Sequence, residues 1–118
     1  MNRRILPQRR SSENFNIRFW NQDFNVTAGR YPDGSLGEIF IDGGKSGQDV
    51  QSTARDAAIL LSLALQFGAT IETIRHAVTR AGNGEAASMM GAIVDKMALF
   101  AVDAAPAAAP SASDGDAI

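Results

Sequence analysis

The sequence predicts an α+β fold, in which three helices pack on one face of a small antiparallel sheet made of a hairpin and one further strand. Apolar and polar side chains alternate through residues 15–41 with the period of two that is typical of half-buried strands. Apolar residues then recur at helical spacing through residues 48–100. Strands that precede the helices, rather than alternate with them, favour an antiparallel sheet covered by a helical layer.

The first strand is predicted where Phe15, Ile17 and Phe19 alternate with more polar neighbours. Residues 24–41 are predicted to form an antiparallel hairpin, because the Tyr-Pro-Asp-Gly sequence at residues 31–34 is a strong turn signal. Proline presets its own φ angle, and glycine permits the positive φ that such turns require.

A long helix is predicted from residue 48 or 49 to residue 67, ended by Gly68. Its second half is apolar nearly all round, which is typical of a buried central helix. The next helix is expected over residues 71–80 with Thr70 as its N-cap, and Ser88 is expected to cap a third helix.

The two ends of the chain are predicted to be disordered. Residues 1–14 form a basic arm with four arginines, and residues 104–118 are a low-complexity tract of alanine, proline and serine. Such a tail buries too little apolar surface to offset its ordering entropy. Residues 15–103 are therefore expected to form a single domain.

Composition excludes several kinds of chemistry. The chain has 118 residues, no cysteine and one histidine, so a disulfide scaffold, a cysteine metal site, a thiol nucleophile and a site of several histidines are ruled out. The net charge of −2 argues against general nucleic-acid binding. No apolar run reaches the roughly 18 residues of a membrane span, and no signal peptide is evident. A cytoplasmic protein is expected.

Several short motifs occur together in a fixed order. These are residues 29–34 (GRYPDG), residues 37–41 (GEIFI), Lys45 and Gly47, residues 62–68 (SLALQFG), and Ile71, Glu72, Ile74 and Arg80. In this order they resemble the TSCPD domain family over about residues 24–98. Members of that family form the C-terminal domain of vitamin B12-dependent ribonucleoside-diphosphate reductases and also occur as small stand-alone proteins.

The chain departs from the family in one respect: it contains no Thr-Ser-Cys-Pro-Asp motif and no cysteine. Ribonucleotide reduction needs one cysteine to carry the radical and a cysteine pair to supply electrons. The resemblance therefore implies an accessory or regulatory role in ribonucleotide reduction and DNA precursor synthesis, without activity of this chain alone. It implies cobalamin only for the related full-length enzymes, and no cofactor is expected on this chain.

Glu38, Lys45 and Gly47 are the first candidate binding residues. Glu38 shares a strand face with Phe40, so it is expected either to orient Lys45, Arg30 or a ligand, or to be a solvated residue or part of a structural ion pair. Lys45 and Gly47 lie in a glycine-rich loop before a helix N-terminus, which either binds an anion such as a nucleotide phosphate or simply turns the chain. The loop does not fit the phosphate-loop motif.

Ser62, Gln66 and Arg80 are the remaining candidates. Ser62 and Gln66 lie with Arg55 on one stripe of the long helix, where they either line a groove for a ligand or partner, or bond to the sheet backbone. Arg80 is expected at the end of the second helix, where it either binds a partner or satisfies helix carbonyls. The single histidine, His76, is expected to be an exposed surface residue.

The leading hypothesis is a regulatory domain that binds a ribonucleotide reductase or a nucleotide. The first alternative is a small nucleotide- or metabolite-binding enzyme with Glu38 and Lys45 as its acid–base pair. The second alternative is a structural homo-oligomer formed through the apolar helices. Nucleic acid and membranes are not expected partners.

Overall fold

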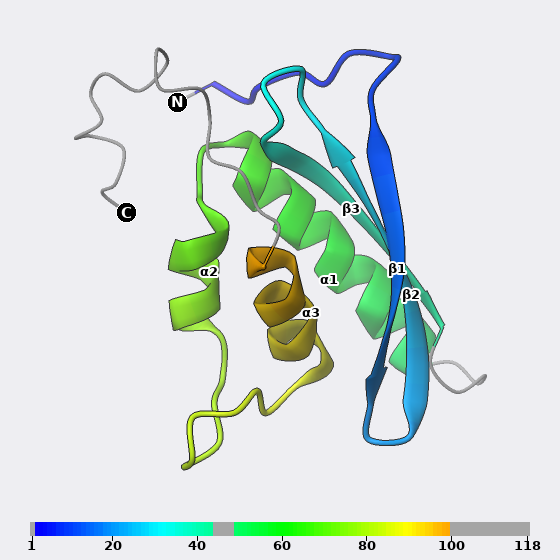
Figure 1. The fold of residues 1–118 in the computed structure, drawn as a ribbon, viewed down its shortest axis with the longest axis vertical. Helices are drawn as coiled ribbons and strands as arrows, with labels where there is room; N and C mark the ends of the chain where they lie inside the picture. Colours follow the sequence, from blue (N-terminus) through cyan, green and yellow to red (C-terminus); the bar gives the residue numbers. More distant parts are fainter. Residues whose placement is uncertain (1, 44–48, 100–118) are drawn as a thin grey trace.

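The computed structural model describes residues 2–43 and 49–99. It contains a three-stranded antiparallel sheet and three helices, in that order along the chain (Figure 1). The elements are β1 (Ser12–Phe19), β2 (Gln22–Arg30), β3 (Leu36–Gly43), α1 (Asp49–Gln66), α2 (Ile71–Ala77) and α3 (Met89–Ala98). The predicted α+β fold is thereby confirmed.

The sheet has the order β1-β2-β3, so β2 is central and both other strands are edges. Phe15 faces Val26 across the first pair of strands, and Ala28 faces Ile39 across the second. The β1–β2 turn consists of two residues, Trp20 and Asn21, both with positive φ. The β2–β3 turn falls where the sequence predicts it.

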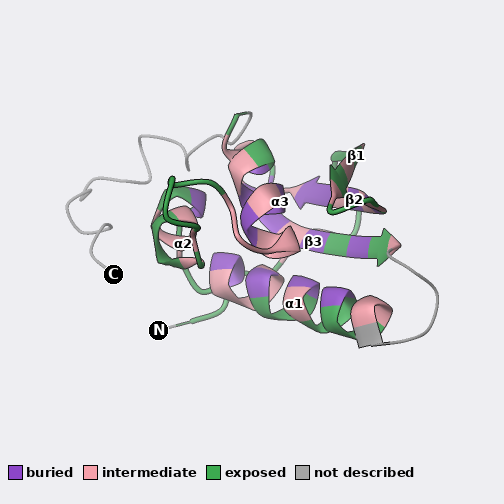
Figure 2. Ribbon diagram, turned by 90° about the horizontal axis from the view of Figure 1, so that it is seen from below, coloured by how far each residue is buried: buried purple, intermediate pink, exposed green. Residues whose placement is uncertain are grey.

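All three helices lie on the same side of the sheet. The side chains that β2 and β3 turn to this side are buried, among them Val26 and Ile39. Helix α1 packs along β3, α3 contacts β1, and α2 packs on α3. In Figure 2 the buried residues of α1 face β3 and its exposed residues face away from the sheet. Ile93, Val94 and Met97 of α3 complete the core.

The predicted helix ends are confirmed at three positions. The side chain of Thr70 accepts a hydrogen bond from the backbone N–H of Thr73, and Ser88 accepts one from Gly91. Gly68 has a φ of 110°, which a residue with a side chain rarely adopts. Within the described part of the chain, no helix is long and apolar enough to cross a membrane.

Two predicted positions need correction. Helix α2 ends at Ala77 instead of Arg80, because Val78 turns to an extended backbone with a ψ of 158°. Arg80 is therefore not part of the helix, and it lies opposite Ala86 in a short β-bridge. Helix α1 is not central either, since it covers one side of the sheet and exposes Ile59 and Leu60.

The basic arm also differs from the prediction. Strand β1 begins at Ser12 rather than Phe15, because Ser12 pairs with Gly29 at the end of β2. Residues 2–11 form neither a helix nor a strand. The arm is nevertheless bound to the domain: the backbone N–H of Arg4 donates to the carbonyl of Gln66 at 2.8 Å. The predicted tail from residue 104 lies outside the described residues.

Candidate functional site

A groove of about 410 Å³ runs between α1 and the outer edge of β3. Three of the six candidate residues, Glu38, Ser62 and Gln66, line it together. Arg55 of α1 lines the same groove. The stripe of Arg55, Ser62 and Gln66 that the sequence predicts on α1 therefore faces this groove. Two elements that are distant in sequence thus bring these side chains together.

Ser62 is bonded to the backbone of β3. Its Oγ accepts the N–H of Ile39 at 2.8 Å and lies 3.2 Å from the carbonyl oxygen of the same residue. It also lies 2.8 Å from the carbonyl oxygen of Ala58, one helical turn earlier. A hydroxyl has one proton, so it donates to one of these two carbonyls at a time. Within the described residues, Ser62 therefore satisfies a residue of an edge strand that has no neighbouring strand on that side.

Gln66 makes a similar hydrogen bond to the backbone of β3, nearer the start of the strand. Its side chain is buried, and its Nε2 donates to the carbonyl of Gly37 at 2.8 Å. Its Oε1 accepts from the guanidinium Nε of Arg3 at 2.6 Å. Both ends of this buried amide are satisfied, as burial requires. The hydrogen bonds of Ser62 and Gln66 agree with the structural alternative, and their role in binding stays a prediction.

Glu38 is paired with an arginine of the basic arm. Arg10 donates to both carboxylate oxygens of Glu38, at 2.9 and 3.2 Å. Gly29 on the adjacent strand leaves room for this pair, since a Cβ at that position would lie 2.9 Å from Glu38 Oε2. The partner of Glu38 is thus an arm residue that the sequence argument did not consider.

Lys45 and Gly47 lie outside the described residues. The predicted anion-binding loop and the predicted pairing of Glu38 with Lys45 therefore have no structural description. They remain predictions from the sequence.

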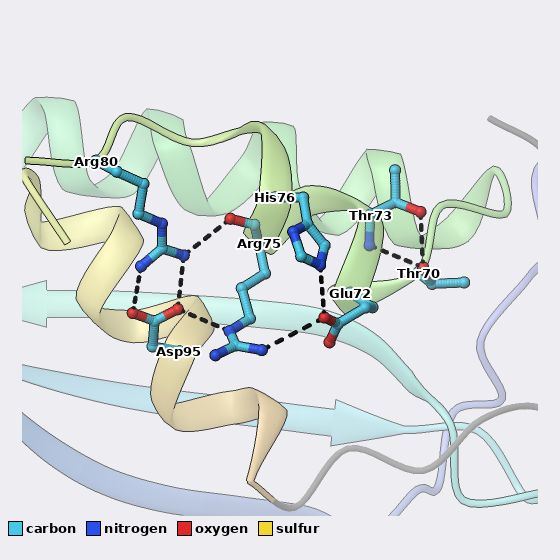
Figure 3. A network of polar contacts seen from close by, with 7 residues as sticks. All are labelled: Thr70, Glu72, Thr73, Arg75, His76, Arg80 and Asp95. Carbon is cyan, nitrogen blue, oxygen red and sulfur yellow. Dashed lines mark hydrogen bonds and ion pairs between the residues drawn. The ribbon is translucent and has the colours of Figure 1, made fainter. Parts of the chain in front are cut away.

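Arg80 does not line the groove. It joins α3 to the segment after α2 (Figure 3). It donates to both carboxylate oxygens of Asp95, at 2.6 and 2.7 Å, and to the carbonyl of Arg75 at 2.8 Å. Hydrogen bonding to Asp95 raises the pKa of Arg80, and the bond from Arg80 lowers the pKa of Asp95. Arg75 also bonds Asp95, at 3.0 Å. This network holds α2 to α3.

His76 lies at the edge of the same network, on the outer face of α2. Its Nε2 is 2.8 Å from Oε2 of Glu72, one turn earlier, and its side chain is largely exposed. Its position matches the expected surface residue. Among the described residues, no group of three or more potential ligands is placed to hold a metal ion.

Exposed apolar side chains lie in this groove and on the neighbouring outer face of α1. Phe40 and Ile59 line the groove and are 54% and 56% exposed. Leu60 on α1 and Phe67 just beyond its end are 67% and 40% exposed. Large exposed apolar side chains that lie near one another are typical of surfaces that bind another molecule. The apolar second half of α1 signalled this surface, but the sequence argument assigned it to burial.

A second cluster missed by the sequence argument surrounds Arg4. Its guanidinium lies 3.7 Å above the ring of Tyr31 and donates to Asp33 at 3.1 Å and to Ser35 at 3.2 Å. The Tyr31 hydroxyl donates to the backbone carbonyl of Arg4 at 2.8 Å. Four arginines before the first strand and an aspartate in the β2–β3 turn are the sequence signals of this contact.

Electrostatics follow from these contacts. Burial raises the pKa of Asp33, but hydrogen bonds from the side chain and backbone of Ser35 and from Arg4 outweigh it and lower the pKa to about 2. Burial raises the pKa of the Tyr31 hydroxyl, and the nearby Arg4 offsets part of this effect. At neutral pH the cluster therefore contains an ionised carboxylate and a neutral phenol.

These features define a small α+β domain whose helical layer protects one edge of the sheet. The chain matches the TSCPD domain over residues 2–101, and it therefore belongs to the TSCPD domain family. The resemblance inferred from the short motifs is confirmed. The family match begins well before residue 24 and includes the basic arm.

Two curated relatives carry the same printed name. The vitamin B12-dependent ribonucleotide reductase of Bradyrhizobium diazoefficiens is 35% identical over 77 residues, and that of Agrobacterium fabrum is 34% identical over 77 residues. Each match covers 65% of this chain but only 6% of the relative. The chain therefore spans a small part of the length of these reductases. No solved structure matches it.

Proposed function

We propose that this chain is an accessory domain of ribonucleotide reduction, which acts in the cytoplasm by binding a ribonucleotide reductase and supports the synthesis of DNA precursors. Membership of the TSCPD domain family and the two reductase relatives support this proposal. The chain has no cysteine, so it cannot supply the thiol chemistry that the family resemblance implies for the full-length enzymes. In this proposal catalysis belongs to the partner.

The exposed apolar surface along the groove is the observation that carries the proposal. In the relatives, the matching segment belongs to a chain with about sixteen times its length, and the rest of that chain is available to cover such a surface. Phe40, Ile59, Leu60 and Phe67 are large side chains of the kind that anchor protein interfaces once water is excluded. The proposed occupant is accordingly the body of a vitamin B12-dependent reductase.

The described residues do not fit cobalamin itself. The clefts of about 520 and 410 Å³ are open to solvent and partly lined by charged side chains, and they offer no enclosed apolar cavity for a corrin ring in the described part of the chain. The single histidine is on the outer face of α2. We therefore assign no step to cobalamin on this chain.

Isothermal titration calorimetry with a purified vitamin B12-dependent reductase tests the proposal. Leu60→Gln is expected to weaken binding at least tenfold, because an interface anchor loses its apolar contact. Leu99→Gln is the matched control, since Leu99 is exposed but belongs to the end of α3. Absence of binding by the unchanged chain, or equal losses in both variants, would contradict the proposal.

Two further measurements separate the alternatives. A nucleotide panel titrated into the chain alone tests for the proposed small enzyme or a nucleotide-binding regulator. Light scattering at high concentration tests for the homo-oligomer, whose formation through the same apolar surface would also be lost in Leu60→Gln. The leading proposal expects a monomer that binds the reductase.

A further inference from the structure

The contacts of Arg4 form a site that recognises both the backbone and the side chain of one arginine. The main-chain N–H of Arg4 donates to Gln66 O at 2.8 Å, and its carbonyl accepts the Tyr31 hydroxyl at 2.8 Å. The guanidinium stacks on the Tyr31 ring and is hydrogen-bonded to Asp33 and Ser35. Planar stacking together with a carboxylate is well suited to arginine and poorly suited to lysine.

The groups that hold Arg4 all belong to the domain. Oδ1 of Asp33 is fixed by the backbone N–H of Ser35 at 2.9 Å and its hydroxyl at 2.6 Å, which leaves Oδ2 for the arginine. The Tyr31 ring lies against Gly37, where a Cβ would be only 2.4 Å from the ring, and Tyr31 is almost fully buried. Asp33 is thus held by Ser35 in the β2–β3 turn, and the Tyr31 ring is packed against Gly37 of β3.

The adjoining surface extends the site along a peptide. On one side, Arg3 bonds the buried amide of Gln66. On the other, a cleft of about 520 Å³ begins beside Asn2 and Arg4 and continues along Phe67, Thr70 and Glu72. Asn2 and Arg4 are the arm residues that line this cleft, and the domain residues that line it with them give a longer extended segment further surface to contact. Asp33 gives this surface a carboxylate that suits a basic segment, whereas Glu72 is already paired with Arg75 and His76.

We propose that this site binds an extended, arginine-bearing segment of a partner protein, and that the chain's own basic arm is the resident ligand that such a segment displaces. The site is named here the arginine cradle and consists of Tyr31, Asp33, Ser35 and Gln66. The inference rests on the contacts of the arm alone and does not depend on the identity of a reductase partner.

Competition sets how strongly the partner must bind. Because arm and cradle belong to one chain, the arm acts at an effective concentration on the order of millimolar. A free peptide with the same contacts therefore binds the unchanged chain weakly, since the cradle is already filled. Removing the Arg4 side chain weakens the resident ligand and leaves every cradle residue in place. A partner segment that binds more tightly than the arm would likewise displace the arm from the cradle.

The test uses a fluorescein-labelled peptide with the sequence of residues 2–8 and the full-length chain, with binding read by fluorescence anisotropy. The Arg4→Ala chain is expected to bind this peptide at least tenfold more tightly than the unchanged chain does. A peptide carrying Arg4→Lys keeps the charge but loses the planar stacking, so it is expected to bind at least fivefold more weakly than the arginine peptide.

A second variant of the full-length chain distinguishes binding in the arginine cradle from general attraction between charges. The Arg4→Ala, Asp33→Asn double variant keeps an oxygen for the Ser35 N–H but loses the carboxylate, and it is expected to bind the peptide at least tenfold more weakly than Arg4→Ala. Circular dichroism checks that both variants are folded. Equal binding by the unchanged and Arg4→Ala chains, or equal binding of the arginine and lysine peptides, would overturn the proposal.

Discussion

Ser62 takes the place of a neighbouring strand at the edge of β3. Its hydroxyl satisfies the N–H of Ile39, which lies at the interface of α1 and the sheet. We predict that Ser62→Ala lowers the free energy of unfolding by about 1–3 kcal/mol, because a partly buried N–H loses its acceptor. Urea denaturation measures this change. Ser52→Ala, at an exposed position of the same helix, is the control and is expected to change stability by less than about 0.5 kcal/mol.

Asp33 makes stability depend on pH in the acid range. Its folded-state pKa of about 2 lies below the ordinary value of 3.8, so its carboxylate stabilises the folded chain above about pH 4. This contribution, about 2 kcal/mol, decreases below about pH 4 and is lost as the pH falls through about 2. Asp33→Asn is therefore expected to be less stable than the unchanged chain at pH 7, and the difference in urea denaturation should shrink toward zero as the pH falls through about 2. A difference that is independent of pH would contradict this assignment.

Gly37 is required by the packing of Tyr31. A Cβ at this position would lie 2.4 to 2.9 Å from three atoms of the ring, which is itself buried. We predict that Gly37→Ala costs about 1–3 kcal/mol of stability and also weakens arm binding, because the ring that supports Arg4 must move. Gly82→Ala is the control in thermal unfolding, since nothing lies within 4 Å of a Cβ there. Similar losses in both variants would show that the ring contact is unimportant.

At the scale of single elements, local signals in the sequence explain which boundaries are predictable. Thr70 and Ser88 cap their helices through hydrogen bonds that span three residues, and Gly68 ends α1 by its own backbone preference. These are interactions within one turn of chain, so short motifs encode them. The early end of α2 has no such marker, because neither glycine nor proline follows Ala77 directly.

The position of α1 shows the limit of such local reasoning. An apolar second half indicates that the helix meets other apolar surface, but it cannot say whether that surface lies within the chain. The structure buries Leu61 and Leu65 against the sheet and leaves Ile59 and Leu60 exposed. Periodicity therefore predicts the helix correctly. It does not predict what contacts the exposed face of the helix, because that contact would involve another molecule.

The candidate site was predictable only in part, for the same reason. Ser62 and Gln66 share a face of α1 by helical geometry, so their proximity follows from the sequence. Their strand partners do not, because the bond between Gln66 and Gly37 joins residues that are 29 positions apart. The contacts of the arm join residues that are even farther apart in the sequence: Arg3 and Gln66 are separated by 63 positions. No local pattern specifies pairs at such distances.

Over the whole molecule, the uneven distribution of charge explains why the arm stays bound. Four arginines lie within the first ten residues, although the chain as a whole has a net charge of −2. Three of these arginines bond the domain, at Gln66, Asp33 and Glu38. These contacts lie on both sides of the β2–β3 turn, over which the arm passes in Figure 1. A basic arm on an acidic body thus becomes part of the fold.

The layered packing also predicts which part of the molecule opens most easily. Helix α2 is only seven residues long, has one residue in the buried class and packs mainly on α3, whereas α1 packs along β3. The network of Arg75 and Arg80 with Asp95 also attaches it to α3. We predict that native-state hydrogen exchange shows α2 opening at a lower free energy than β2, because few buried contacts must break.

Arg80→Lys tests whether the network limits this opening. Lysine keeps the charge but cannot donate through a planar fork to both oxygens of Asp95, so the amides of α2 are expected to exchange faster while those of β2 change little. Arg18→Lys is the matched control, because the ion pair of Arg18 with Asp23 is exposed at the far end of the sheet. Protection of α2 equal to that of β2, or equal effects of the two variants on α2, would mean that the helices open as one cooperative unit with the sheet.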